Sequence, residues 1–292
     1  MQAIKIEALT HIYSKKTPAE KVALDNINLS IEEGEFVAIV GHTGSGKSTL
    51  VQHLNGLMKP HKKGKTGRVE IFGKSTTEKK GLKQLRFDVG MVFQYPEYQL
   101  FEDTVAKDIA FGSKNMKLDK EEIDKRVRKS LELVGLPYDD FAERSPFELS
   151  GGEKRRVAIA GVIAMEPKIL VLDEPFAGLD PEGVKEITEL VLKLKREVCP
   201  TIIMVTHDMD SASTLADRIV ALKEGKIVAD DIPSKVFGNR ALIKEIGLDV
   251  HFVARVVDKL SAQGIKLDKN IITIQELAEA LERIKAGGGD NV

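Results

Sequence analysis

A glycine-rich loop between an apolar run and a helical segment constrains this chain more than any other feature. The run Glu35 to Val40 reads EFVAIV, and the eight residues 41–48 that follow read GHTGSGKS and open into a helical pattern. Glycines let successive backbone N–H groups converge, and the helix N-terminus adds about half a positive charge there. The strand, loop and helix together predict a phosphate-binding loop, and a chance glycine-rich turn is the disfavoured alternative.

Each position of this loop has an expected role. Lys47 is expected to reach the β and γ phosphates of a nucleotide, and the Ser48 hydroxyl to bind Mg²⁺. The phosphate contacts are expected from the whole loop and the residue after it, namely Gly41, His42, Thr43, Gly44, Ser45, Gly46, Lys47, Ser48 and Thr49.

Two carboxylates end a second apolar run, Lys168 to Glu174, which reads KILVLDE. Ligands of open α/β sheets bind at the carboxyl ends of the strands. Asp173 is therefore the expected Mg²⁺ partner, and Glu174 is expected to polarise an attacking water. Solvated surface acids are the alternative. Because kinases, GTPases and other ATPases share these two elements, they leave the reaction class open.

A third motif narrows the choice among these classes of nucleotide-binding enzyme. Residues 149–153 read LSGGE, and Ser150, Gly151 and Gly152 would offer a hydroxyl and exposed N–H groups at a helix start, a second anion cradle. The motif resembles the signature of ABC ATPases, in which the signature of one subunit caps the nucleotide of another. The resemblance therefore implies an ATPase that works as a dimer, with ATP and Mg²⁺ as cofactors. A lone Ser-Gly-Gly turn is the plain alternative.

Four further residues stand where that family places functional ones. The resemblance implies that Gln94 senses Mg²⁺ and a membrane partner, that His207 contacts the γ-phosphate, that Asp180 belongs to a loop at the dimer interface, and that Tyr13 stacks on adenine. Each alone is more simply an ordinary structural or loop residue. The resemblance covers about residues 1–237.

Two continuations point to a subfamily. Residues 93–105, FQYPEYQLFEDTV, and 153–162, EKRRVAIAGV, look like the A-components of energy-coupling factor (ECF) importers of vitamins or metal ions, nearest to the second A-component. This implies a heterodimer with another A-component, with a homodimer as the alternative. It also implies a membrane T-component docked on the region Gln94 to Phe101, substrate-binding S-components, and a peripheral place on the cytoplasmic face of the membrane. A conventional ABC transporter ATPase is the alternative.

The pattern of apolar runs predicts an α/β fold with a mostly parallel sheet. The resemblance to ABC ATPases implies that this sheet belongs to a P-loop NTPase (RecA-like) core. Partial alternation in Ile4–Ala8, Leu24–Ile31 and Val69–Phe72 predicts an antiparallel β subdomain. A helical insertion is expected at about 100–165, within a domain covering 1–237. We expect an α-rich extension at 238–292, with a strand at Asn270–Ile274 and a capping box from Thr273 to Glu276. The resemblance implies that this extension takes part in dimerisation.

Composition excludes several classes. The 44 basic and 45 acidic residues nearly cancel, so nothing favours nucleic acid, and the basic cluster His61–Lys65 is better explained as a solvated turn. The apolar run Val157–Met165 is too short to span a bilayer, which predicts a soluble, cytoplasmic chain. The single Cys199 is expected to be a packing residue. ABC ATPases that act on DNA or ribosomes usually contain a long coiled coil or a second ATPase cassette, and this sequence has neither. The presence of both Glu174 and His207 disfavours the other alternative, a module that binds ATP without hydrolysing it.

Overall fold

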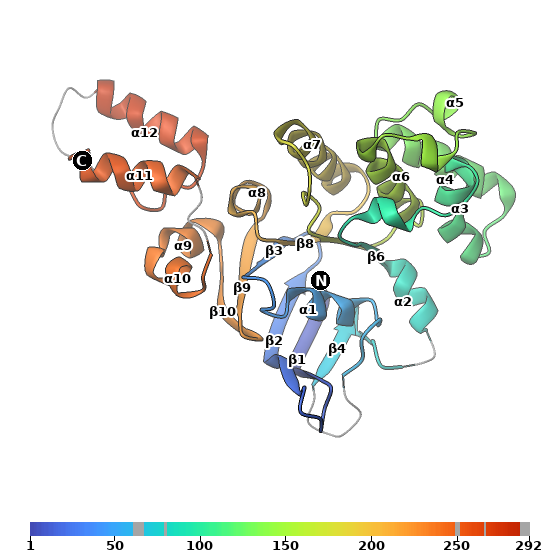
Figure 1. Ribbon diagram of the computed structural model, residues 1–292, viewed down its shortest axis with the longest axis horizontal. Coiled ribbons are helices and arrows are strands. Elements are labelled where there is room, and N and C mark those ends of the chain that lie inside the picture. The colour runs from blue at the N-terminus through green and yellow to red at the C-terminus, as the bar shows by residue number, and fades with distance from the viewer. Residues whose placement is uncertain (61–66, 79–80, 249–251, 266, 287–292) are drawn as a thin grey trace.

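The computed structural model describes residues 1–60, 67–78, 81–248, 252–265 and 267–286. The basic cluster His61–Lys65 and the glycine run Gly287–Gly289 lie outside these residues. Figure 1 shows two sheets at the centre, with helices on the outer face of the larger one and a helical pair at the far C-terminal end.

The larger sheet has six strands in the order β10-β9-β3-β8-β7-β6. All neighbours are parallel except β9 and β10, and every residue of β3, β7 and β8 is buried. Burial on both faces explains why these strands are continuous apolar runs. The predicted mostly parallel core is confirmed. The strands are β3 (Phe36–Val40), β6 (Val89–Val92), β7 (Ile169–Asp173), β8 (Thr201–Thr206), β9 (Arg218–Lys223) and β10 (Lys226–Asp231).

The smaller sheet is antiparallel, as predicted, with the order β2-β1-β4-β5. Its buried side chains form one hydrophobic core with the inner face of the larger sheet and with α1 (Lys47–Leu54). The two sheets therefore enclose the helix that follows the glycine-rich loop. The strands are β1 (Gln2–Tyr13), β2 (Lys21–Glu32), β4 (Arg68–Ile71) and β5 (Lys74–Ser75).

Helices cover the other face of the larger sheet, over a second hydrophobic core. The helical insertion is present between β6 and β7, where Thr104 and Asp119 cap the first residues of two helices as expected of such side chains. The insertion contains η1 (Pro96–Gln99), α3 (Val105–Asn115), α4 (Lys120–Leu133), α5 (Tyr138–Phe141), η2 (Pro146–Glu148) and α6 (Gly151–Ile163). The remaining helices of the core are α2 (Leu82–Asp88), α7 (Pro181–Glu197), α8 (Met209–Leu215), α9 (Pro233–Gly238) and α10 (Arg240–Glu245).

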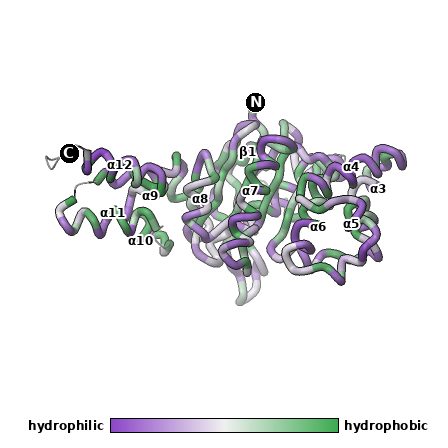
Figure 2. The backbone as a smooth tube through the Cα atoms, turned by 90° about the horizontal axis from the view of Figure 1, so that it is seen from above, coloured by the Kyte–Doolittle hydropathy of each residue, from purple (hydrophilic) through white to green (hydrophobic). Residues whose placement is uncertain are grey.

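Within the predicted extension 238–292, α10 packs on the main core through Ile243. The two described helices beyond it, α11 (Phe252–Ala262) and α12 (Ile274–Ala286), pack on each other through Val253, Val257 and Leu277. Figure 2 shows them at the opposite end of the molecule from α3 to α5. The expected strand Asn270–Ile274 is wrong, because this segment is a turn that leads into α12. The predicted capping box explains the helix start: Glu276 accepts from the Thr273 N–H, and Thr273 Oγ1 accepts from the Glu276 N–H.

Candidate functional site

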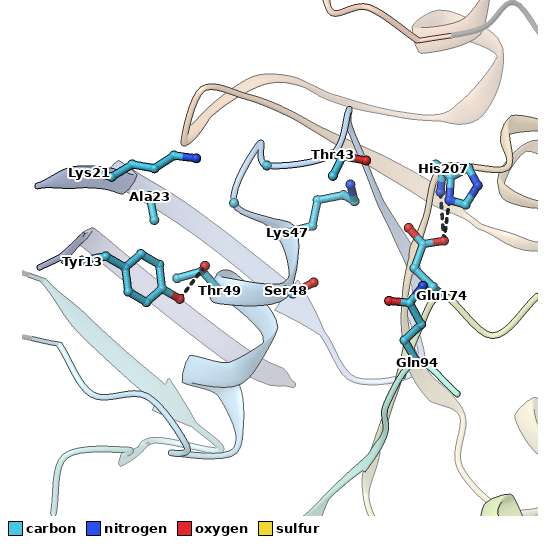
Figure 3. A pocket seen from close by; sticks show the side chains of 12 residues that line it. Tyr13, Lys21, Ala23, Thr43, Lys47, Ser48, Thr49, Gln94, Glu174 and His207 are labelled. Carbon is cyan, nitrogen blue, oxygen red and sulfur yellow. Dashed lines mark hydrogen bonds and ion pairs between the residues drawn. The ribbon is translucent and has the colours of Figure 1, made fainter. Parts of the chain in front are cut away.

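A cleft of about 360 Å³ opens where the glycine-rich loop meets the carboxyl edge of the larger sheet. Figure 3 shows the side chains that face it, from β1 and β2 on one side to the ends of β7 and β8 on the other. The cleft is lined by Tyr13, Lys21, Ala23, Thr43, Gly44, Gly46, Lys47, Ser48, Thr49, Gln94, Glu174 and His207. Ten of these twelve residues were predicted from the sequence, all except Lys21 and Ala23.

Two glycines of the loop are required by close backbone contacts. A Cβ on Gly46, whose φ is +108°, would lie 2.4 Å from the carbonyl oxygen of Ala23. A Cβ on Gly41, at φ +154°, would lie 2.3 Å from the carbonyl oxygen of Leu222. Neither position can hold a side chain, so the loop passes directly between the backbones of the two sheets.

Lys47 lies at the first position of α1 and reaches back over the loop. Its Nζ donates to the carbonyl oxygens of Gly41 at 2.7 Å and His42 at 3.2 Å. The side chain is buried, and burial lowers the pKa of Lys47, while the charges of Glu174 and Asp173 act in the opposite direction. A cation held in this way, at the centre of the cleft, is placed to bind phosphate oxygens.

Asp173 ends β7 directly opposite the start of α1. Ser48 Oγ donates to Asp173 Oδ1 over 3.5 Å. Burial is the main reason that the pKa of Asp173 is raised; the Ser48 hydroxyl opposes the shift and the Glu174 charge adds to it. The Ser48 hydroxyl and the Gln94 amide line the cleft, and the buried Asp173 carboxylate lies beside Ser48 without lining it. Such hard oxygen donors are the ligand type that Mg²⁺ prefers, so the residues present fit the ion.

Glu174 follows Asp173 and turns away from the sheet in a left-handed backbone conformation, φ 51°. Its Oε2 accepts from the backbone N–H of His207 at 3.3 Å and lies 2.8 Å from the Nδ1 of the His207 ring. β7 and β8 are neighbours, and this explains why residues 33 positions apart meet. Figure 3 shows the pair at the edge of the cleft beyond Lys47.

Tyr13 forms the opposite wall of the cleft. Its hydroxyl lies 3.0 Å from Thr49 Oγ1, and its ring is partly exposed, which leaves a face available for stacking. Lys21 and Ala23 were missed by the sequence analysis. Lys21 pairs with Tyr13 across the β1–β2 hairpin, so a register drawn from the alternation of both strands could have pointed to it.

The signature residues do not line this cleft. Ser150 caps α6, where its Oγ accepts from the Glu153 N–H and the Glu153 carboxylate accepts from the Ser150 N–H. Gly151 and Gly152 are exposed in the first turn of the same helix, and Asp180 caps α7 through the Gly183 N–H. Of the remaining predicted residues, Ser45 is buried behind the loop and His42 Nδ1 contacts the Thr43 carbonyl oxygen.

The sequence matches a known protein family. A model of the ABC transporter family, described as "ABC transporter", matches residues 24–177. The chain belongs to the ABC transporter family. It is 50% identical to the energy-coupling factor transporter ATP-binding protein EcfA2 of Clostridium tetani and 51% identical to that of Clostridium perfringens, over 97% of this chain and 97% and 98% of those proteins.

Solved structures of ABC proteins are similar to this chain in fold as well as in sequence. The structure of cbiO1 from Clostridium perfringens, described as part of the ABC transporter complex cbiONQ, has a TM-score of 0.74 and 40% identity, covering 89% of this chain and 99% of that one. The ATP-binding cassette MJ0796, dimeric in a post-hydrolysis state with ADP and Pi, has a TM-score of 0.68 and 34% identity, covering 79% of this chain and 98% of that one.

These relatives confirm the prediction that the chain is an ECF-type ABC ATPase. It is an ATP-hydrolysing energy-coupling subunit, and the predicted P-loop fold is confirmed with it. Among the described residues no helix is both long and apolar enough to cross a membrane.

Proposed function

We propose that this chain hydrolyses Mg²⁺-ATP between two ATPase chains and that closure of the pair drives an ECF importer of vitamins or metal ions. The observation that carries the proposal is the placement of Glu174, bound to His207, across the cleft from Lys47. A carboxylate held at this edge, facing a cation at the phosphate loop, is the arrangement that hydrolysis of a terminal phosphate needs.

Each residue of the cleft has a separate role in the proposed reaction. Lys47 and the loop N–H groups bind the β and γ phosphates, and Tyr13 stacks on adenine. Glu174 orients a water and accepts its proton as the water oxygen forms a bond to the γ-phosphorus and the bond to the bridging oxygen breaks, with ADP as leaving group. His207 binds the γ-phosphate from the end of β8. Mg²⁺, held by Ser48, Asp173 and Gln94, would neutralise charge on the phosphate oxygens.

The site is completed by a second chain. Ser150, Gly151 and Gly152 present a helix N-terminus outside the cleft of their own chain, and an N-terminus of this kind favours an anion. We assign these residues to the γ-phosphate bound by the partner, and Asp180 to the interface between the two. The partner is a second ECF A-component, with a second copy of this chain as the alternative. The extension 238–292 adds a dimerisation surface.

The docking segment, residues Gln94 to Phe101, receives the membrane T-component. Tyr98 and Phe101 are exposed, and the Phe101 ring packs edge-on against the exposed ring of Phe111, 5.0 Å between centroids. Exposed aromatic side chains grouped on one surface are typical of a site that binds a partner helix. Docking there places the chain on the cytoplasmic face of the membrane, where S-components deliver the substrate.

Affinity purification of the tagged protein from detergent-solubilised native membranes, with mass spectrometry of the bound proteins, tests this assembly. We expect a second ATPase, a helical membrane protein and several small membrane proteins. A conventional permease in their place would move the chain to another transporter class. Exclusively soluble or ribosomal partners would contradict the transport role. Hydrolysis by the isolated chain at a rate per molecule independent of concentration would contradict the shared site.

A further inference from the structure

One arginine of the helix that carries the signature is almost fully buried. Arg155 lies in the second turn of α6, and only 4% of its side chain is exposed. A buried guanidinium is costly unless its N–H groups find acceptors. Its partners therefore show which parts of the chain it holds together.

The Arg155 guanidinium joins three segments. Its Nε and Nη2 donate to the two carboxylate oxygens of Glu97 in η1, at 3.2 and 3.1 Å. Nη1 donates to the carbonyl oxygen of Pro175 at 3.2 Å, and Nη2 donates also to that of Ala177 at 2.9 Å. A two-pronged arginine–carboxylate pair fixes direction as well as distance. Arg155 thus links the docking segment, the turn after β7 and the signature helix.

Both segments that Arg155 holds begin in an uncommon backbone conformation. Tyr95, two residues before Glu97, has φ 55°, and Glu174, directly before Pro175, has φ 51°. Left-handed backbone at residues other than glycine persists when surrounding contacts hold it, and it is frequent at sites that switch. A Cβ on Gly178 would lie 3.4 Å from the Tyr95 ring, so the two segments also pack on each other directly.

We propose that Arg155 is a positioning residue that makes the docking segment, Glu174 and Ser150 move as one body. The inference rests on the proposed function, in which a membrane partner displaces the docking segment. Displacement of η1 moves Glu97, and the rigid arginine fork carries this movement to the turn behind Glu174 and to the helix capped by Ser150. Arg155 is absent from the lining of the cleft, so it acts through these residues and not on the nucleotide.

Hydrogen exchange in the full-length, membrane-purified complex tests the proposal. Amide exchange of peptides covering 95–101 and 174–180 is compared with ADP and with ATP, for wild type, Glu97→Gln and Arg155→Lys. In wild type we expect both peptides to respond to ATP together. In both variants we expect the response of 95–101 to fall at least roughly twofold while 174–180 still responds, since the link is broken and the cleft is intact.

Kinetics give a second readout. The ratio of substrate transported to ATP hydrolysed should fall roughly tenfold in Glu97→Gln, whereas the KM for ATP should change less than about twofold. The reason is that loss of the link misplaces groups outside the nucleotide contacts, which affects the reacting geometry and not nucleotide binding. Arg156→Gln is the matched control. Arg156 is the next residue on α6 and pairs at the surface with Glu186, so its loss should leave both readouts unchanged.

Glu97→Gln also protects the test against misfolding, because Arg155 keeps both carbonyl acceptors in that variant. Exchange responses that remain coupled, or an unchanged transport ratio, would overturn the proposal. Failure of the proposed function is a different result. It would appear as normal hydrolysis by a Glu174 variant or as missing membrane partners on purification, whereas failure of this proposal would appear only in the variants, in a complex whose wild type hydrolyses ATP and transports substrate.

Discussion

The Oε2 atom of Glu174 lies 2.8 Å from the Nδ1 of His207, and the same oxygen accepts the backbone N–H of that histidine. The carboxylate is thereby held by the end of the neighbouring strand, on the far side of the cleft from Lys47. Positioning of this kind matters in hydrolysis because a general base acts only within hydrogen-bonding reach of the water it activates.

Glu174→Gln should separate nucleotide binding from turnover. The amide keeps the size of the side chain and loses the proton acceptor, so we expect kcat for ATP hydrolysis to fall roughly 10² fold or more. The Kd for ATP should change little. Steady-state hydrolysis and equilibrium binding on the same preparation measure the two quantities. Hydrolysis close to the wild-type rate would reject Glu174 as the base.

Lys47→Ala should act on binding. Removal of a charged donor to the phosphates costs about 2 kcal/mol, or roughly thirtyfold in the Kd for ATP. Titration with a fluorescent ATP analogue measures it, and Lys74→Ala, an exposed lysine of β5, is the control. An unaltered Kd in the Lys47 variant would argue against the phosphate role of the loop.

Gly152→Ala should distinguish a role between chains from a role in folding. A Cβ on Gly152 meets no atom within 4 Å, and its backbone is not left-handed, so the folded chain accepts alanine and the melting temperature should stay equal or rise. ATP hydrolysis by the dimer should fall roughly tenfold or more, because in the proposed dimer these residues bind the partner's γ-phosphate. Gly46→Ala is the contrasting variant: its Cβ would collide with the Ala23 carbonyl oxygen, and it should lower the melting temperature.

Stability should depend on the charge of Asp173. Burial raises the pKa of Asp173 in the folded chain, so the folded state binds its proton more tightly than the unfolded state does. This contribution to the free energy of unfolding is therefore present at low pH and is lost as pH rises from about 4, the pKa of an ordinary aspartate. Without nucleotide, Asp173→Asn should melt above wild type at pH 7, and the difference should close towards pH 4. A constant difference would contradict this.

Cys199 should be inert in the folded protein. The thiol is fully buried, and burial raises the pKa of Cys199 to about 12. At pH 8 only about one molecule in 10⁴ carries the thiolate, the form that reacts with iodoacetamide. Labelling should therefore require unfolding in urea, and mass spectrometry follows it. Rapid labelling of the native chain would mean that the region around β8 opens locally.

Local patterns explain what could be predicted from the sequence. The continuous apolar strands, the loop at Gly41 to Ser48 and the signature at Ser150 depend on residues close in the chain, and each appears where expected. The strand predicted at Asn270–Ile274 is wrong because the isoleucines there suit a strand, whereas the capping contacts of Thr273 and Glu276 begin a helix. Composition alone does not show whether the strand propensity of this segment or the helix-capping contacts will decide its conformation.

What escaped the sequence analysis depends on tertiary contacts. Lys21 and Ala23 enter the cleft because the β1–β2 register brings them there. Arg155 and Glu97 are 58 residues apart, and nothing in the two motifs announces that they pair. Such contacts follow from the packing of the helical insertion on the sheet, which no local period encodes.

The glycine-rich loop is enclosed by main chain rather than by side chains. Gly46 faces the Ala23 carbonyl, and the Ser45 carbonyl accepts from the Gly225 N–H, whose own carbonyl accepts from the Asp25 N–H. Because these contacts order the loop when the chain folds, nucleotide binding does not have to order it. Substitution of the exposed side chains in this part of β2, Lys21 and Val22, therefore leaves the main-chain contacts that hold the loop in place.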